Sequence, residues 1–194
     1  MNPAPGRLVL ATHNAHKVEE LRRILGPRLG DTELVGYDGP EPVEDGATFE
    51  ANALIKARAA FHHTGVPAIA DDSGISVAAL GGAPGIHSAR YAGTRDDGDN
   101  LRLLLERMTG VADRTAHFTC AAAYVASGVE HVEVGIWPGW LLQHPAGAGG
   151  FGYDPIFQPV GVDVSSAELT PDEKNAISHR AMAFSKLFRY IHAL

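Results

Sequence analysis

The stretch Ala70-Asp71-Asp72-Ser73-Gly74 separates two short apolar runs, residues 66–70 and 75–77. Each run has the length and composition of a buried strand in an α/β sheet. Two adjacent carboxylates at the end of such a strand form an anion-rich corner that can hold a divalent cation and orient a water molecule. An Asx-turn, in which the aspartates bond to their own backbone, is the alternative for the same residues.

Composition limits the class of protein. The chain has 194 residues, 45% of them hydrophobic, which suffices for one sizeable core and predicts a single domain over residues 1–194. The formal charge of −7 argues against a nucleic-acid polymer as partner, because such binding needs a broad basic face.

The single cysteine, Cys120, excludes an internal disulfide and a multi-cysteine zinc site, and its apolar surroundings predict a buried thiol. The N-terminal apolar patch is too short for a signal peptide or a membrane span, so we expect a cytoplasmic protein.

A strand is predicted over residues 8–12, followed directly by a helix with Asn14 as its cap. Apolar positions at helical spacing continue to Leu25, and Gly26-Pro27 is expected to end the helix. The junction Thr12-His13-Asn14-Ala15-His16-Lys17 presents backbone N–H groups and a lysine, and helix N-termini of this kind attract phosphate. A plain solvated cap is the alternative for this junction.

The acidic segment Glu44-Asp45-Gly46 leads into a second predicted helix, which begins after Thr48 and ends at Gly65. Asn52 and Lys56 lie four residues apart and therefore share one face of this helix. That polar row is consistent either with a binding surface or with an ordinary solvated face.

The second half of the chain has clear strand and helix signals. Residues 116–126 and 129–137 predict a β-hairpin. Residues 170–173 form a capping box that starts a helix carrying Lys174. Residues 178–180, Ser-His-Arg, stand at the entry to a final amphipathic helix, where a solvated corner is the alternative to a binding site.

A glycine-rich stretch covers residues 147–155 and contains Phe151 and Tyr153. Glycines allow the backbone to approach a ligand closely, and aromatic rings can stack on a planar base. An irregular core loop whose aromatic side chains simply pack inward is the alternative.

Taken together and in order, these polar segments resemble the inosine triphosphate pyrophosphatase family, which hydrolyses non-standard purine nucleoside triphosphates such as ITP, dITP and XTP. The matching segments are ATHNAHKVEEL (11–21), EDGATFEANALIKARAA (44–60), AIADDSGISVAALGGAPGIHSARYAG (68–93), GGFGYDPIF (149–157) and ELTPDEKNAISHR (168–180). Five segments in register are a specific signal. The resemblance implies hydrolysis of a nucleoside triphosphate to the monophosphate and pyrophosphate, with Mg²⁺ as the required cofactor.

The resemblance also implies a role for each matching residue. Asp72 matches the general base, which is also associated with the metal, and Glu44 matches an acidic residue implicated in metal binding. Residues matched to phosphate or ligand contacts are Thr12, His13, Asn14, Ala15, His16, Lys17 and Ser73. Residues matched to the nucleoside pocket, or to closure over base and phosphate, are Phe151, Gly152, Tyr153, Asp154, Lys174, His179 and Arg180.

We therefore expect an α/β fold with a long, twisted, mixed β-sheet flanked by helices. The resemblance implies two lobes with a central active-site cleft, a homodimer, and a purine nucleoside triphosphate as substrate, so that the enzyme cleanses nucleotide pools. Two alternatives remain: a related pyrophosphatase acting on modified pyrimidine triphosphates, and a catalytically silent nucleotide-binding regulator. The intact Asp71-Asp72 pair argues against the regulator, because a sensor can lose a water-activating carboxylate and still bind its ligand.

Overall fold

The computed structural model describes residues 6–194, which contain six strands and five α-helices. The expected single domain begins at residue 1, so its first five residues lie outside the described range. In chain order the elements are β1 (Arg7–Leu10), α1 (Ala15–Leu29), β2 (Glu33–Gly36), α2 (Phe49–Thr64), β3 (Ala68–Val77), α3 (Asp97–Arg107), β4 (Thr115–Ala126), β5 (Val129–Leu141), β6 (Phe157–Pro159), α4 (Pro171–Ile177) and α5 (His179–Ile191). Short 3₁₀ helices cover Ala78–Leu80, Gly85–Arg90 and Asp154–Ile156.

The six strands are hydrogen-bonded in the order β2-β1-β3-β4-β5-β6. β1 pairs in parallel with both β2 and β3, whereas β5 pairs antiparallel with β6. The connections that contain α1 and α2 serve the parallel strands, which need long crossovers. The expected α/β fold with a mixed sheet flanked by helices is thus confirmed, and the two lobes with a central cleft stay a prediction.

The chain divides into two compact units. The first unit contains the described residues up to Asp72, together with Cys120–Gly135 and His179–Leu194. The second unit contains Ser73–Thr119 and Ile136–Ser178. The residues expected to carry chemistry therefore fall into two groups, and each group is described within its own unit.

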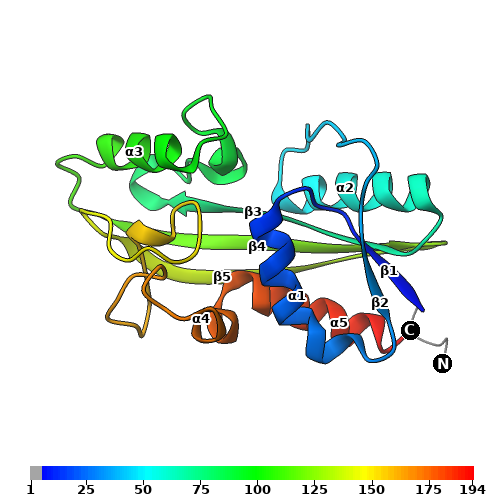
Figure 1. Cartoon of the computed structure of the whole chain (residues 1–194). Coiled ribbons are helices and arrows are strands. Elements are labelled where there is room, and N and C mark those ends of the chain that lie inside the picture. The colour runs from blue at the N-terminus through cyan, green and yellow to red at the C-terminus, as the bar shows by residue number, and fades with distance from the viewer. Residues whose placement is uncertain (1–5) are drawn as a thin grey trace. The chain divides into compact units, whose positions relative to one another are not determined.

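Strand residues of the first unit alternate between two apolar cores. The core that includes Leu8, Leu10 and Ile69 is completed by apolar side chains of α1 and α5. The core that includes Val9, Ala68 and Ala70 is completed by small side chains of α2. Figure 1 shows α1 and α5 side by side across these strands from α2. Because neighbouring strand residues point to opposite faces, odd and even positions of β3 meet different helices.

The second unit has an aromatic core. The Phe118 and Phe157 rings meet edge to face with 4.7 Å between centroids, and Trp137 lies 5.3 Å from Phe157. α4 begins with the predicted capping box, in which the Thr170 hydroxyl accepts from the Glu173 N–H and the Glu173 carboxylate accepts from the Thr170 N–H.

Several predicted boundaries are confirmed. α2 begins after Thr48, whose side chain caps it, and ends at Gly65 in the left-handed conformation. The hairpin of β4 and β5 turns at residues 127–128, although β5 continues beyond the predicted end to Leu141. The final helix starts at His179 as expected.

The position of the acidic pair was predicted wrongly. β3 runs without interruption from Ala68 to Val77, so Asp71 and Asp72 lie within a continuous strand and not at a strand end or in an Asx-turn. A strand can carry two adjacent carboxylates here because alternation sends them to opposite faces, where each meets its own hydrogen-bond donors.

The end of α1 was also predicted wrongly. The helix continues through Gly26 and Pro27 to Leu29, and Gly30 follows as its C-cap. Pro27 cannot donate to the Arg23 carbonyl, and the helix continues for only two residues beyond it. The Arg28 guanidinium also donates to the Ile24 carbonyl at 2.6 Å, which satisfies a carbonyl of the same helix.

Candidate functional site

The adjacent carboxylates of β3 define the centre of the candidate site in the first unit. Asp71 has the parity of Ile69, so its side chain points toward α1 and α5. Asp72 has the parity of Ala70 and points toward α2. Both residues are buried, so each carboxylate depends on the groups that its own face supplies.

Asp71 is enclosed by two cations. Its Oδ2 lies 3.1 Å from Lys17 Nζ of α1 and 3.2 Å from Arg180 Nη2 of α5. Arg180 Nε donates to the same oxygen at 3.3 Å, and Arg180 Nη1 donates to Glu20 of α1. Burial raises the pKa of the Asp71 carboxyl, but attraction from Lys17, Arg180 and Lys56 outweighs burial and holds that pKa well below its usual range.

The thiol of Cys120 belongs to the same buried group. Its Sγ donates weakly toward Asp71 Oδ2 at 3.9 Å. Burial, together with the Asp71 charge, raises the pKa of this thiol. Cys120 is therefore the buried, unreactive thiol that the sequence predicts.

Asp72 meets a different set of groups, all anchored to α2. Asn52 Nδ2 donates to Asp72 Oδ2 at 3.2 Å, and Lys56 Nζ lies 3.4 Å from Asp72 Oδ1. Lys56 Nζ also lies 2.9 Å from Glu44 Oε2, so one ammonium bridges both carboxylates. Burial raises the pKa of Asp72, and the neighbouring Lys56 and Lys17 lower it only in part.

The loop before α2 is held in place by the same amide that serves Asp72. The Gly46 N–H donates to Asn52 Oδ1 at 2.9 Å, which fixes the segment that carries Glu44. Burial disfavours the Lys56 ammonium, but attraction from Asp72, Asp71 and Glu44 outweighs burial and raises the pKa of Lys56. Lys56 therefore stays protonated between the two carboxylates.

The turn from Thr12 to Lys17 forms the N-terminus of α1 as predicted. Asn14 caps the helix by accepting from the Lys17 N–H at 3.2 Å, and the Asn14 N–H donates to Thr12 Oγ1 at 3.2 Å. His13, Asn14, Ala15 and His16 are exposed, and the His13 ring lies 5.6 Å from that of Tyr37. Exposed N–H groups at a helix N-terminus and a lysine in the same turn are suited to binding an anion.

The second unit holds the glycine-rich segment around a buried carboxylate. Asp154 accepts from the Phe151 N–H at 2.9 Å, the Ser166 hydroxyl at 2.8 Å and Lys174 Nζ at 2.6 Å. Lys174 Nζ also lies 5.1 Å from the centre of the half-buried Phe151 ring. Asp154 and Lys174 therefore fix the position of Phe151.

Two other groups stabilise this segment. The buried Tyr153 donates its hydroxyl proton to the Ser88 carbonyl at 2.8 Å, and the Gly152 N–H donates to Asp97 Oδ2 at 2.8 Å. Gly150 has a φ of 68°, and a Cβ there would lie 2.1 Å from Asp154 Oδ2. Only glycine leaves room for that carboxylate.

A Mg²⁺ ion in the first unit would depend on its carboxylate side chains for ligands. Within residues 6–194 no group of three or more His, Cys, Asp or Glu side chains is arranged to hold a metal ion. Mg²⁺ in nucleotide sites is commonly bound by one or two carboxylates, with phosphate oxygens and water as its remaining ligands. Glu44 and Asp72, which face one another across Lys56 Nζ, supply such a pair.

Within the first unit, Lys17 and Arg180 thus meet Asp71 on one face of β3, and the turn from Thr12 leads into the helix that carries Lys17. On the other face, Lys56 joins Glu44 to Asp72. His179 is buried at the start of α5, and Ser73 follows Asp72 on β3 as the first residue of the second unit. The roles expected for these residues stay predictions.

Sequence reasoning missed three contributors. Glu20, a partner of Arg180, follows Lys17 by three residues, so helical spacing could have indicated a shared face. Gly135 lies between the apolar residues Val134 and Ile136 of β5, and a glycine inside a strand is a signal of close backbone approach. A Cβ at Gly135 would lie 2.1 Å from the His179 carbonyl oxygen, so this glycine lets α5 approach the strand. Ser166, the third donor to Asp154, has no sequence signal.

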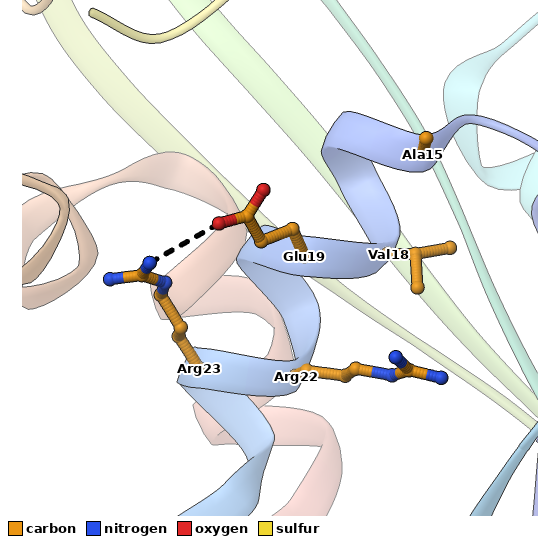
Figure 2. A pocket seen from close by; sticks show the side chains of 5 residues that line it. All are labelled: Ala15, Val18, Glu19, Arg22 and Arg23. Carbon is orange, nitrogen blue, oxygen red and sulfur yellow. Dashed lines mark hydrogen bonds and ion pairs between the residues drawn. The ribbon is translucent and has the colours of Figure 1, made fainter.

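A separate pocket lies on the outward face of α1 (Figure 2). Its lining residues are Ala15, Val18, Glu19, Arg22 and Arg23. Arg23 Nη2 pairs with Glu19 Oε1 at 3.2 Å, and both side chains are exposed. Apart from Ala15, none of these residues is among those expected to bind substrate.

In the described part of the chain, no helix combines the length and the apolar character needed to cross a membrane.

Comparison with known proteins gives a consistent result. The model of the Ham1 family matches residues 8–190. A dITP/XTP pyrophosphatase of Leifsonia xyli subsp. xyli is 55% identical over 192 residues, which cover 97% of this chain and 96% of the relative. One of Methylococcus capsulatus is 46% identical over 195 residues, covering 97% of each.

Solved structures of Ham1 proteins and of a dITP/XTP pyrophosphatase are similar to this chain as well. A HAM1 protein from Coxiella burnetii superposes with a TM-score of 0.88 at 38% identity, covering 97% of this chain and 99% of that one. A nucleoside-triphosphatase / dITP/XTP pyrophosphatase from Mycobacterium abscessus has a TM-score of 0.76 at 45% identity, covering 93% and 98%. With a family match over most of the sequence and relatives this similar along their whole length, the chain belongs to the Ham1 family.

Proposed function

We propose that this protein hydrolyses non-standard purine nucleoside triphosphates, dITP, ITP and XTP, to the monophosphate and pyrophosphate, and so cleanses nucleotide pools. Relatives that are 46–55% identical and named dITP/XTP pyrophosphatases support the proposal. The observation that carries it is the environment of Asp72, a buried carboxylate with a raised pKa that lies beside Lys56.

In the proposed reaction Asp72 orients the attacking water molecule and accepts its proton. A raised pKa suits this task, because a general base works best when its pKa approaches the working pH. Such a positioned base contributes roughly 10²–10⁴-fold to the rate. Lys17 and Lys56 neutralise charge that develops on the phosphate oxygens as pyrophosphate leaves.

We propose Mg²⁺ as the cofactor, held by Asp72 and Glu44. The residues around the acidic pair include three cations, Lys17, Lys56 and Arg180, and four carboxylates, Glu20, Glu44, Asp71 and Asp72. This group is therefore net acidic and cannot by itself attract a polyanionic triphosphate. A bound divalent cation would supply the missing positive charge and polarise the phosphate.

We assign the purine to Phe151. Its half-buried ring offers a face for stacking, and the Asp154–Lys174 ion pair fixes its place. Preference for a 6-keto purine over adenine would follow from a hydrogen-bond donor that faces position 6 of the base. Such a donor is left unpaired against an amino group, which is heavily penalised.

The test is the release of pyrophosphate and of orthophosphate from dITP, XTP, dATP, dGTP and dTTP, with Mg²⁺ or with EDTA. Metal-dependent pyrophosphate from dITP and XTP, with little from dATP or dGTP, is the expected result. Preference for pyrimidine triphosphates would favour a related pyrophosphatase. Nucleotide binding without turnover would favour a silent regulator, and orthophosphate alone would indicate a phosphatase.

We further propose that the protein is a homodimer. Ile136, Pro138 and Trp140 alternate on β5 as an exposed row, and the Val160 N–H bonds to the Pro138 carbonyl beside them. An apolar row on the open face of a strand is typical of an interaction surface. Light scattering of Trp140→Glu should show a monomer.

A cytoplasmic location, which the free thiol of Cys120 supports, can be tested by cell fractionation.

A further inference from the structure

Asp71 is a buried carboxylate to which the proposed reaction gives no role. Its side chain is 0% exposed, whereas that of Asp72 is 12% exposed. The positions of its partners show what it does: Lys17 comes from the first turn of α1, and Arg180 from the first turn of α5. One carboxylate oxygen therefore ties two helix starts to the middle of β3.

Asp71 is not suited to act as the base. Water has no access to its side chain, and two cations stabilise its ionised form. The proposed base Asp72 and Asp71 are neighbours in sequence but differ in accessibility and in partners.

The contact with Lys17 has a direct consequence for phosphate binding. The Lys17 side chain is 15% exposed, so its ammonium is buried enough to be held and open enough to reach a ligand. A free lysine has four rotatable bonds and loses that freedom when it meets an anion. Asp71 uses one of the three ammonium donors and leaves two for phosphate oxygens.

We propose that Asp71 is a positioning residue: its buried carboxylate holds the Lys17 ammonium against β3, so that Lys17 meets a phosphate oxygen in a fixed place. This inference rests on the proposed hydrolysis of nucleoside triphosphates. Arg180 completes the arrangement, because its guanidinium clamps the same Asp71 oxygen and is itself held by Glu20.

A simple charge effect of Asp71 would change kcat/KM in the opposite direction from a positioning role. If Asp71 acted only as one more negative charge near the phosphates, its removal would strengthen substrate binding. If it positions Lys17, its removal weakens the use of Lys17 although the site becomes more positive. The direction of the change in kcat/KM therefore separates the two accounts.

The experiment is a double-mutant cycle of Asp71→Asn and Lys17→Met, with kcat and KM measured on dITP and Mg²⁺. The loss of a hydrogen bond to a charged group changes an equilibrium constant by roughly tenfold or more. Lys17→Met should therefore lower kcat/KM by at least about tenfold. Asp71→Asn should lower it by about tenfold, and the double variant should resemble Lys17→Met alone to within about threefold. Most of the Asp71→Asn effect should appear in KM.

Two results would overturn the inference: a rise in kcat/KM for Asp71→Asn, or a double variant whose loss is the product of the two single losses. The latter would mean that Asp71 acts on the fold and not through Lys17. Absence of dITP turnover in the unmutated protein would instead reject the proposed function, and the inference with it.

A second variant leaves Asp71 in place, in case Asp71→Asn does not fold. Lys17→Arg keeps the charge but changes its position and geometry, so it should lower kcat/KM by about tenfold if placement matters. The matched control is Arg23→Lys on the outward face of the same helix, which should leave kcat/KM unchanged (Figure 2). Full activity of Lys17→Arg would contradict the positioning role.

Discussion

The two faces of β3 treat the same kind of residue in opposite ways. On the face covered by α1 and α5, Asp71 has two cations on one oxygen, and its pKa is lowered. On the face covered by α2, Asp72 has an amide and a shared lysine, and its pKa is raised. The comparison shows that burial alone does not decide the pKa of a carboxyl. For Asp71 the attraction of nearby cations outweighs desolvation, whereas for Asp72 it does not.

The largest expected effect is on turnover. Asp72→Asn should lower kcat by roughly 10²–10⁴-fold or more, because the amide cannot accept the proton of the attacking water. Steady-state kinetics and nucleotide binding by calorimetry measure the two quantities separately, and nucleotide affinity should remain largely in place. Asp72→Asn with near-normal kcat would remove Asp72 as the base.

The next effect is on stability, where Asp71, and not Asp72, is the residue whose loss should cost more. Asp71→Asn should lower the free energy of unfolding by about 3–5 kcal/mol, as expected when one partner leaves a buried charge network. Asp71 Oδ1 has no hydrogen-bond partner among residues 6–194, so an amide NH₂ placed there would be unsatisfied as well. Asp72→Asn should gain stability at pH 7, because folding disfavours its ionised form.

Urea unfolding at pH 7 measures both variants. Equal losses for Asp71→Asn and Asp72→Asn would contradict the distinction between the two faces. The pH dependence adds a check: folding lowers the pKa of Asp71, so its contribution is present above the ordinary carboxyl pKa of 3.8 and is lost as the pH falls below it. In Asp71→Asn this acid-dependent loss should shrink.

A smaller effect concerns how α5 reaches the strand. Gly135→Ala should cost about 1–3 kcal/mol, because its Cβ would meet backbone atoms of α5, the His179 carbonyl at 2.1 Å and the Ala183 nitrogen at 2.8 Å. Displacement of α5 would also move Arg180 away from Asp71. The matched control is Gly36→Ala at the exposed end of β2, where nothing lies within 4 Å. Equal urea midpoints for the two variants would contradict this account.

Much of the fold could be predicted from local signals. The caps Asn14 and Thr48, the capping box at Thr170 and the hairpin of β4 and β5 depend on side chains close in sequence. The continuous strand through Asp71 and Asp72 could not be predicted in this way. Its acidic pair is stable only because α1, α2 and α5 supply cations or amides from up to 109 residues away.

For the candidate site, the residue pattern identified the acidic pair, but only the family resemblance, and not the pattern, separated Asp71 from Asp72. Their parity on β3 becomes informative only when the strand is known to be unbroken. Likewise, the segment around Phe151 suggested stacking, but the support from Asp154, Ser166 and Lys174 depends on contacts across the second unit. Side-chain identity is local information, whereas the environment that sets a pKa is not.

The most direct test of the account is the pH dependence of kcat/KM for dITP in the unmutated protein and in Asp71→Asn. We predict an acid limb governed by one group whose pKa lies above the ordinary aspartate value of 3.8, with activity falling as Asp72 is protonated. The limb should persist in Asp71→Asn. A limb that disappears in Asp71→Asn would mean that Asp71 is the base, and it would contradict the assignment of the two carboxylates.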